Sequence, residues 1–83
     1  MKVVCVKEKL ISNIDRIHTT DMGYERIQKN LNIDTDVVKY CVGKIMDKNS
    51  IVYKKGKNYY CEANNIRITI NSSTYTIITA KKN

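Results

Sequence analysis

The spacing of apolar residues changes once along the chain, close to Ser50. Before it, apolar side chains recur every three or four positions, as in amphipathic helices; after it, they alternate with polar ones, as in strands. The pattern predicts helices over residues 6–17, 22–32 and 36–48, and strands over residues 51–55, 58–63, 66–71 and 74–80. Helices followed by strands indicate an α+β fold.

Short polar residues separate the predicted elements. Residues 18–21 and 34–36 precede the second and third helices and contain Thr and Asp, which are good N-caps. Gly23 falls in the first turn of the second helix, where glycine permits a close approach. The strands are joined by two-residue turns and must therefore be antiparallel neighbours. We expect a single domain over residues 1–83, with three N-terminal helices packed on one face of a four-stranded antiparallel meander.

The third predicted strand has two distinct faces. Apolar and polar residues alternate strictly over residues 66–71. Ile66, Ile68 and Ile70 are expected to point to one side of the sheet, and Arg67, Thr69 and Asn71 to the other. One face is expected to bury against the helices while the other stays polar. The fourth strand is ambiguous, because isoleucines occupy both positions 77 and 78.

Positive charge is concentrated in the predicted sheet. The formal net charge is +7, and residues 51–83 contain six Lys or Arg against one acidic residue, Glu62. A basic patch points to an anionic partner such as nucleic acid, a phosphorylated small molecule or an acidic protein. Surface lysines that only maintain solubility explain the same charge equally well.

The cysteines and the apolar runs bear on compartment and cofactors. Cys5, Cys41 and Cys61 are widely spaced and His18 is the single histidine, so no metal-binding pattern is present and no cofactor is expected. Free buried thiols suit a reducing cytoplasm. No apolar run has the length of a signal peptide or a membrane span, so we expect a cytoplasmic protein without a membrane partner.

Three segments carry a recognisable signature. Residues 17–31 read IHTTDMGYERIQKNL, residues 55–60 read KGKNYY, and residues 68–80 read ITINSSTYTIITA. In these segments the chain resembles a small bacterial family called domain of unknown function 3781, over nearly its whole length. Tyr59 stands where tryptophan is frequent in that family, and Lys81 stands where histidine commonly follows T-A, which removes a candidate catalytic imidazole. The resemblance implies the fold and brings no established activity.

The first functional hypothesis is a non-catalytic binder of a phosphorylated nucleotide in a bacterial cytoplasm. Arg67, Lys55 and Lys57 would hold phosphates, and Tyr59 or Tyr60 would stack a base. Further polar contacts would come from Thr69, Asn71, Thr74, Thr76, His18, Thr19 and Thr20. Small basic phage proteins that act as sponges for nucleotide immune signals, such as cyclic nucleotides or ADP-ribose derivatives, are similar in size and charge. Such proteins form homo-oligomers, which free edges on the first and fourth strands would permit.

The second hypothesis is a metal-independent ribonuclease toxin. Helices followed by a four-stranded antiparallel sheet are similar to the barnase, colicin and RelE group, in which a polar sheet face cleaves RNA through its 2′-hydroxyl. His18 would be the general acid or base, Lys55 and Arg67 would stabilise the transition state, and Thr76 or Thr79 would orient the groups. A lone histidine is more often structural, which ranks this hypothesis below the binder.

A winged-helix DNA-binding protein ranks third. The second and third helices with the hairpin after Lys54 are similar to a helix-turn-helix and its wing. Residues 35–48 mix acidic with basic side chains, however, and four strands exceed what a wing needs. Threonines on a solvated strand face also follow from strand propensity alone. Strand propensity explains the threonines less well as a set, because Arg67, Asn71 and Lys55 accompany them on neighbouring strands.

Overall fold

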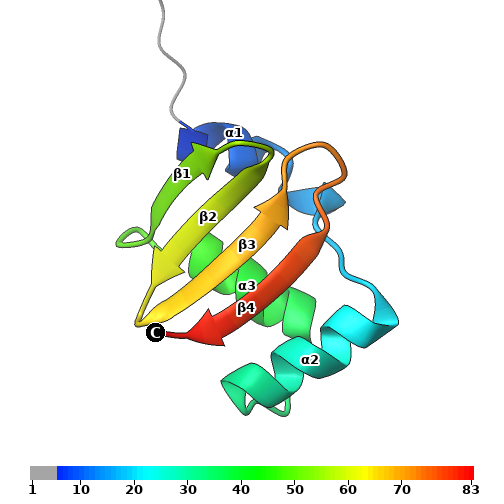
Figure 1. Ribbon diagram of the computed structural model, residues 1–83. Coiled ribbons are helices and arrows are strands. Elements are labelled where there is room, and N and C mark those ends of the chain that lie inside the picture. Colours follow the sequence, from blue (N-terminus) through cyan, green and yellow to red (C-terminus); the bar gives the residue numbers. More distant parts are fainter. Residues whose placement is uncertain (1–5) are drawn as a thin grey trace, which may run out of the picture.

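The computed structural model describes residues 6–83, in which three α-helices precede four strands (Figure 1). The elements are α1 (Val6–Ser12), a 3₁₀ turn η1 (Ile14–Arg16), α2 (Asp21–Leu31), α3 (Val37–Met46), β1 (Ile51–Lys55), β2 (Asn58–Ala63), β3 (Ile66–Asn71) and β4 (Ile77–Lys82). The strands form one antiparallel sheet in the order β1-β2-β3-β4. The expected α+β arrangement is therefore confirmed. None of the described helices is long and apolar enough to cross a membrane.

The first helix is shorter than its apolar spacing predicts. α1 ends at Ser12, whose Oγ donates to the Glu8 carbonyl, and the Asn13 side chain donates to the Lys9 carbonyl. Such local side-chain bonds compete with continuation of a helix. After η1 the backbone is extended at Ile17. The predicted helix over residues 6–17 is therefore wrong beyond Ser12, whereas α2 and α3 begin and end within two residues of their predicted bounds.

The predicted caps start α2 and α3. Thr20 Oγ1 accepts a hydrogen bond from Gly23 N, and Asp36 Oδ1 accepts one from Lys39 N, each at 3.0 Å. A cap of this kind is worth about 1 kcal/mol. A Cβ atom at Gly23 would lie 2.5 Å from Thr19 Oγ1. A side chain at this position would displace the Thr19 hydroxyl from the Ile77 carbonyl, so glycine favours the close approach where α2 begins.

A bulge in β4 decides which way its adjacent isoleucines point. Thr69 pairs with Thr79 and Ile70 pairs with Ile77, so Ile78 is the extra residue. Ile77 is 1% exposed and faces the core, whereas Ile78 is 44% exposed. A strand over residues 74–80 is predicted, but β4 begins only at Ile77 because the preceding residues form the turn from β3.

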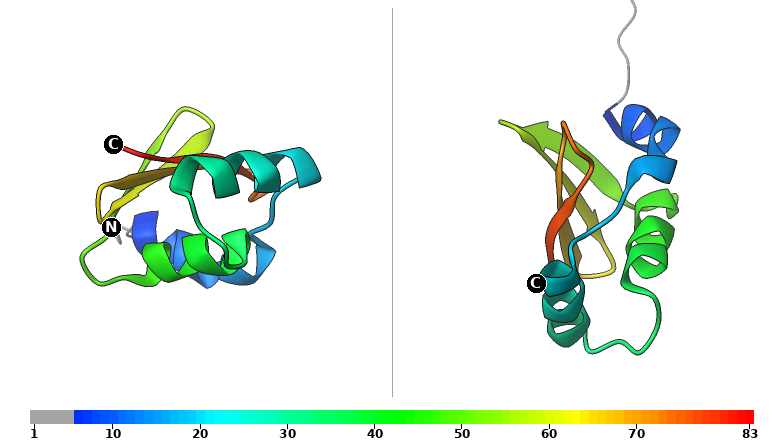
Figure 2. Two further views of the ribbon diagram at one scale, coloured as in Figure 1. Left: turned by 90° about the horizontal axis from the view of Figure 1, so that it is seen from below. Right: turned by 90° about the vertical axis from the view of Figure 1, so that its right-hand side faces the viewer.

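α1 and α3 lie on one face of the sheet, whereas α2, expected on the same face, lies along the outer edge of β4; the opposite face carries no helix in the described part of the chain (Figures 1 and 2). α1 contacts β1, α3 contacts β2, and α2 runs along β4. Ile66, Ile68 and Ile70 are all buried under the helices, as their alternation predicts. They form one core with residues of every helix and of β2 and β4: Leu10, Ile27, Leu31, Val37, Cys41, Ile45, Tyr59, Cys61, Ile77 and Ala80.

The outer edge of β4 is covered, contrary to the expectation that both outer strands have free edges. His18 N donates to the Tyr75 carbonyl at 3.2 Å, and Ile77 N donates to the His18 carbonyl at 2.7 Å, which makes a short parallel bridge. The Thr19 hydroxyl donates to the Ile77 carbonyl, and the Asn30 side chain donates from α2 to a further carbonyl of β4. These bonds use outward backbone groups from Tyr75 to Ala80 that another strand would need for pairing.

Cys41 and Cys61 are free thiols in the core. Burial is the main cause that raises the pKa of Cys41 to about 12 and that of Cys61 to about 11. Both thiols are therefore protonated at neutral pH, and the thiolate is the reactive form. The expected buried state is confirmed for these two residues, and Cys5 lies outside the described residues.

Alanine at Ile77 is expected to lower the free energy of unfolding by about 2–5 kcal/mol, because it leaves a cavity under the sheet. The same change at Ile78 should alter it by no more than about 0.5 kcal/mol, as for other exposed positions. Urea unfolding followed by circular dichroism measures both variants. Equal losses would contradict the bulge.

Candidate functional site

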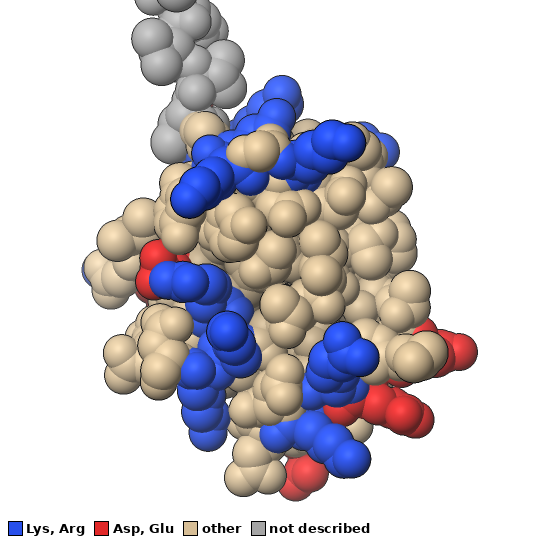
Figure 3. Space-filling view, viewed as in Figure 1, with Lys and Arg blue, Asp and Glu red and all other residues tan. Residues whose placement is uncertain are grey.

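The helix-free face of the sheet, which we call the open face, displays three rows of side chains. In order from β1 to β4 they are Ile51, Glu62, Arg67 and Lys81; then Tyr53, Tyr60, Thr69 and Thr79; then Lys55, Asn58 and Asn71. The residues between these rows point to the helices, because side chains alternate along a strand. Figure 3 shows Lys and Arg toward the two ends of this face, with an uncharged area between them.

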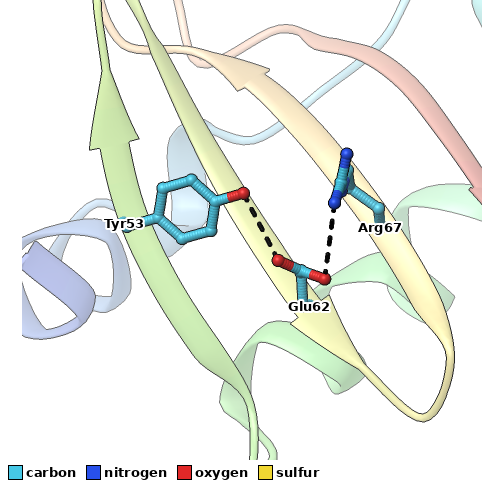
Figure 4. A network of polar contacts seen from close by, with 3 residues as sticks. All are labelled: Tyr53, Glu62 and Arg67. Atoms are coloured by element: carbon cyan, nitrogen blue, oxygen red, sulfur yellow. Dashed lines mark hydrogen bonds and ion pairs between the residues drawn. The ribbon is translucent and has the colours of Figure 1, made fainter.

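Glu62 connects two residues of the open face (Figure 4). Tyr53 donates its hydroxyl hydrogen to Glu62 Oε2 at 3.3 Å, and Arg67 Nη2 lies 3.6 Å from Glu62 Oε1. The side chains of Arg67 and Glu62 are 43% and 34% exposed, so this ion pair contributes about 1 kcal/mol at most. Arg67 Nε is buried and has no hydrogen-bond partner among the described residues. An anion could therefore displace Glu62 from Arg67 at small cost.

Sequence reasoning overlooked Glu62 and Tyr53. The signal was present in the Asn64-Asn65 turn, where both residues have positive φ, 50° and 64°. A two-residue turn of this kind sets the hairpin register. That register places Glu62 directly opposite Arg67.

The tyrosines divide between the open face and the core. The rings of Tyr53 and Tyr60 stack with centroids 5.4 Å apart and an angle of 20° between their planes. Tyr59 points the other way and is 2% exposed, with its ring centroid 6.1 Å from that of Tyr75. This burial corrects the expectation that Tyr59 could stack a base and leaves Tyr60 in that role. Thr69 is largely covered within the same row.

His18 begins a chain of side-chain hydrogen bonds at one end of the sheet. His18 Nδ1 lies 2.8 Å from the Arg16 carbonyl oxygen, and Nε2 lies 3.1 Å from Thr76 Oγ1. Thr76 Oγ1 is in turn 2.8 Å from Thr74 Oγ1. A carbonyl oxygen only accepts, so Nδ1 must be the donor. In a neutral ring Nε2 is then unprotonated and accepts from the Thr76 hydroxyl. The backbone carbonyl of Arg16, the last residue of η1, thus determines the orientation of the imidazole.

The turn between β3 and β4 supports this chain of bonds. Asn71 Oδ1 accepts from the backbone N–H groups of Ser73 and Thr74 at 2.8 and 3.0 Å. Tyr75 follows with a φ of 59°, which is unusual for a bulky residue, and is 4% exposed beneath the Arg16 guanidinium, 4.5 Å from its ring centroid. A residue held in this region costs roughly 1–3 kcal/mol, and such residues cluster at functional sites.

The predicted site residues separate into two groups along the sheet. His18, Thr74 and Thr76 lie at the end where β3 turns into β4. The turn between β1 and β2, which carries Lys55 and Lys57, lies at that same end, because Ser72 N donates to the Lys57 carbonyl at 2.8 Å. Arg67 lies toward the other end.

The distance between the two groups follows from the strand geometry. Arg67 is four residues along β3 from Asn71, a separation of about 13 Å at the usual rise of a strand. Arg67 therefore does not join the groups around His18, and a single ligand could contact both only by lying along the open face. Thr19 and Thr20 belong to neither group. Their hydroxyls hold the edge of β4 and cap α2.

Comparison with known proteins gives one match. The model of the family described as "Protein of unknown function (DUF3781)" matches residues 11–81. No curated protein and no solved structure matches the chain. Two of the segments on which the family signature rests, residues 17–31 and 68–80, meet in space at the bridge between His18 and Thr76.

The geometry around His18 predicts its tautomer. When the ring is neutral, the proton should reside on Nδ1, because only a donor can bind the Arg16 carbonyl. Long-range ¹H–¹⁵N correlation spectra of the imidazole distinguish the two tautomers directly. A neutral ring protonated on Nε2 would contradict the described contact.

Proposed function

We propose that this chain, which belongs to the DUF3781 family of proteins of unknown function, binds a phosphorylated nucleotide on the open face of its sheet without catalysing a reaction. The observation that carries the proposal is Tyr60. It is an aromatic ring on a helix-free sheet face, stacked on Tyr53, with basic side chains toward both ends of the face. Aromatic rings in basic surroundings are how many proteins hold single nucleotides and strands.

The middle row of the open face supports contacts to the base and the sugar. A base stacked on Tyr60 contributes about 1–3 kcal/mol in comparable sites. Thr79, which pairs with Thr69 in the same row, offers its hydroxyl to ribose oxygens, whereas Thr69 itself is only 9% exposed. Tyr53 supports Tyr60 from the other side, since its ring lies against Tyr60 and its hydroxyl is bonded to Glu62.

The two ends of the open face support contacts to phosphates. Lys55 and Lys57 are exposed at the turn between β1 and β2, and Arg67 lies about 13 Å away along the strand direction. The Arg67 side chain is 43% exposed, and its Nη2 is held only loosely by Glu62, 3.6 Å away. This spacing suits a ligand with phosphates on both sides of a base, such as a cyclic dinucleotide or an ADP-ribose derivative.

The proposal extends to the setting in which the ligand is met. Non-catalytic binding of a signalling nucleotide would lower its free concentration, which is how a phage-type sponge acts. We place the protein in the cytoplasm, where buried free thiols such as Cys41 and Cys61 are typical. An open sheet face covers a ligand from one side only, which favours a homo-oligomer as the binding unit.

Isothermal titration with cyclic dinucleotides and ADP-ribose derivatives should detect binding. Tyr60→Ala is expected to raise the Kd roughly 5- to 150-fold, the equivalent of one lost stack. Tyr40→Ala is the matched control, since Tyr40 is on α3 in the helical layer with Lys44 over its ring. Arg67→Gln should also weaken binding, and Arg26→Gln on α2 should not.

Two results would count against the binder. If every nucleotide fails to bind the folded protein, the proposed ligand class is wrong. If long DNA or RNA binds instead, with an affinity that falls steeply with salt, a winged-helix function is favoured.

A second candidate, metal-independent RNA cleavage, is favoured by the contact between His18 and Thr76. An imidazole held by a carbonyl on Nδ1, with Nε2 facing a hydroxyl, has the geometry of a general base. Nε2 would take the proton of a 2′-hydroxyl that replaces Thr76, and the 2′-oxygen would bond to phosphorus. The P–O5′ bond would break to leave a 2′,3′-cyclic phosphate, while the 5′-oxygen takes a proton from solvent. Arg67 is too far along β3 to assist at this position, which ranks cleavage below binding.

Incubation of end-labelled single-stranded RNA with the protein in excess EDTA tests the second candidate. The binder proposal expects no cleavage by the wild-type chain. Cleavage to 2′,3′-cyclic phosphate ends that is lost in His18→Ala and retained in Lys48→Ala would establish the ribonuclease and overturn the binder. Lys48 is an exposed cation after α3 and controls for loss of a basic side chain.

A further inference from the structure

We propose that the protein forms a two-fold symmetric homodimer in which β1 pairs antiparallel with β1 of a second copy. The result is a continuous eight-stranded sheet. The proposal concerns assembly, and it holds or fails independently of the ligand on the open face.

The two edges of the sheet differ in their backbone partners. Along β4 the His18 bridge, Thr19 and Asn30 bind four outward backbone groups, the N–H of Ile77 and the carbonyls of Tyr75, Ile77 and Ala80. On β1 every second residue directs its N–H and C=O away from β2. Within residues 6–83 no backbone group of residues 51–55 is bonded to anything beyond β2. Among residues 6–83, β1 is therefore the outer strand whose edge is free for strand addition.

The side chains of β1 favour a protein strand as the occupant. Ile51 is 65% exposed and Tyr53 is 36% exposed, both on the open face. Proteins commonly protect free edge strands with lysines, prolines, bulges or short strand length. Here Lys54 and Lys55 sit only at the end of the strand, and its first three residues, IVY, are apolar or aromatic.

Charge and the pairing of side chains across the two strands select one register for a second copy. Pairing centred on Val52 places Ile51 opposite Tyr53 of the second copy, twice in each dimer, and aromatic rings pair well with β-branched residues. The lysines then lie opposite residues 49 and 50, outside the strand. The backbone N–H and C=O of Ser50 are already bonded to Asp47 and Lys7, so the new ladder is confined to residues 51–53. Pairing centred on Lys54 would place Lys54 opposite its own copy, and like charges directly opposite are destabilising. Pairing centred on Tyr53 would leave Ile51 opposite Lys55.

One open edge in the described part of the chain makes the assembly finite. A two-fold axis uses the same surface on both copies, so each copy has no further edge once the pair has formed. The two open faces become one surface, and the two stacks of Tyr53 on Tyr60 lie beside each other across the axis. The dimer therefore presents a ligand-binding surface twice as wide as that of one copy, built from the same side chains.

The charge of the chain predicts how salt acts on the dimer. Each copy carries a formal net charge of +7, so association brings two positive bodies together. Salt screens this repulsion and should strengthen the dimer. Binding of a phosphorylated ligand to basic side chains should weaken with salt. Because salt should act in opposite directions on dimerisation and on ligand binding, the two proposals can fail separately and the failures can be told apart.

Sedimentation equilibrium over a range of concentrations, at low and at high salt, tests the dimer. The wild-type chain should show a monomer–dimer equilibrium that salt shifts toward dimer, with no larger species. Ile51→Lys should raise the dissociation constant by about tenfold or more, because each dimer loses two apolar cross-strand pairs. Ile78→Lys is the matched control, an exposed isoleucine on the opposite edge strand, and should leave dimerisation unchanged.

Circular dichroism should show both variants folded, and amide hydrogen exchange should show protection of alternate β1 residues that rises with protein concentration. A wild-type chain that stays monomeric throughout would overturn the proposal. Equal weakening by the two variants would also overturn it. Protection of β1 that does not depend on concentration would show that another segment of the same chain lies on the edge, with the same consequence.

Discussion

The attachment of His18 to the edge of β4 is the contact on which the rest of the arrangement depends. It brings the extended segment before α2 onto the sheet, and α2 then runs along β4 because Thr20 caps it there and Gly23 lets it approach. The same contact closes one edge of the sheet and orients the imidazole toward Thr76. One short bridge therefore determines the placement of a helix, the state of an edge and the geometry of the polar groups at one end of the sheet.

The order of elements and the buried face of β3 could be predicted from sequence, because both follow from local periodicity. Thr20 and Asp36 were predictable as caps for the same reason, since a cap acts within one turn. What local patterns do not contain is the docking of His18, whose partner on β4 is far away in the chain. The bulge belongs to the same class. Ile77 and Ile78 look alike in sequence, and only pairing with β3 decides which of them is buried.

The candidate site shows the same division between local and distant information. The open-face residues of β3 follow from alternation, and Glu62 could have been found from the hairpin register opposite Arg67. The burial of Tyr59 depends on which face the helices cover, which the alternation of β2 alone does not decide. The binder and the cleavage hypotheses draw on different ends of one sheet. Tyr60 and Arg67 serve the first, and His18 with Thr76 serves the second.

The bridge between His18 and Thr76 also has a consequence for the order in which the chain folds. The two residues are separated by 58 positions, whereas the first two hairpins of the meander close over two-residue turns. Contacts between distant residues carry a larger loop-closure entropy and form late when local contacts are available. The meander can therefore assemble first, with the edge of β4 still exposed, and α2 docks afterwards. Until that last step a nascent chain has two unpaired strand edges, those of β1 and β4, instead of one. Aggregation by edge-to-edge pairing of sheets is therefore favoured most before His18 docks.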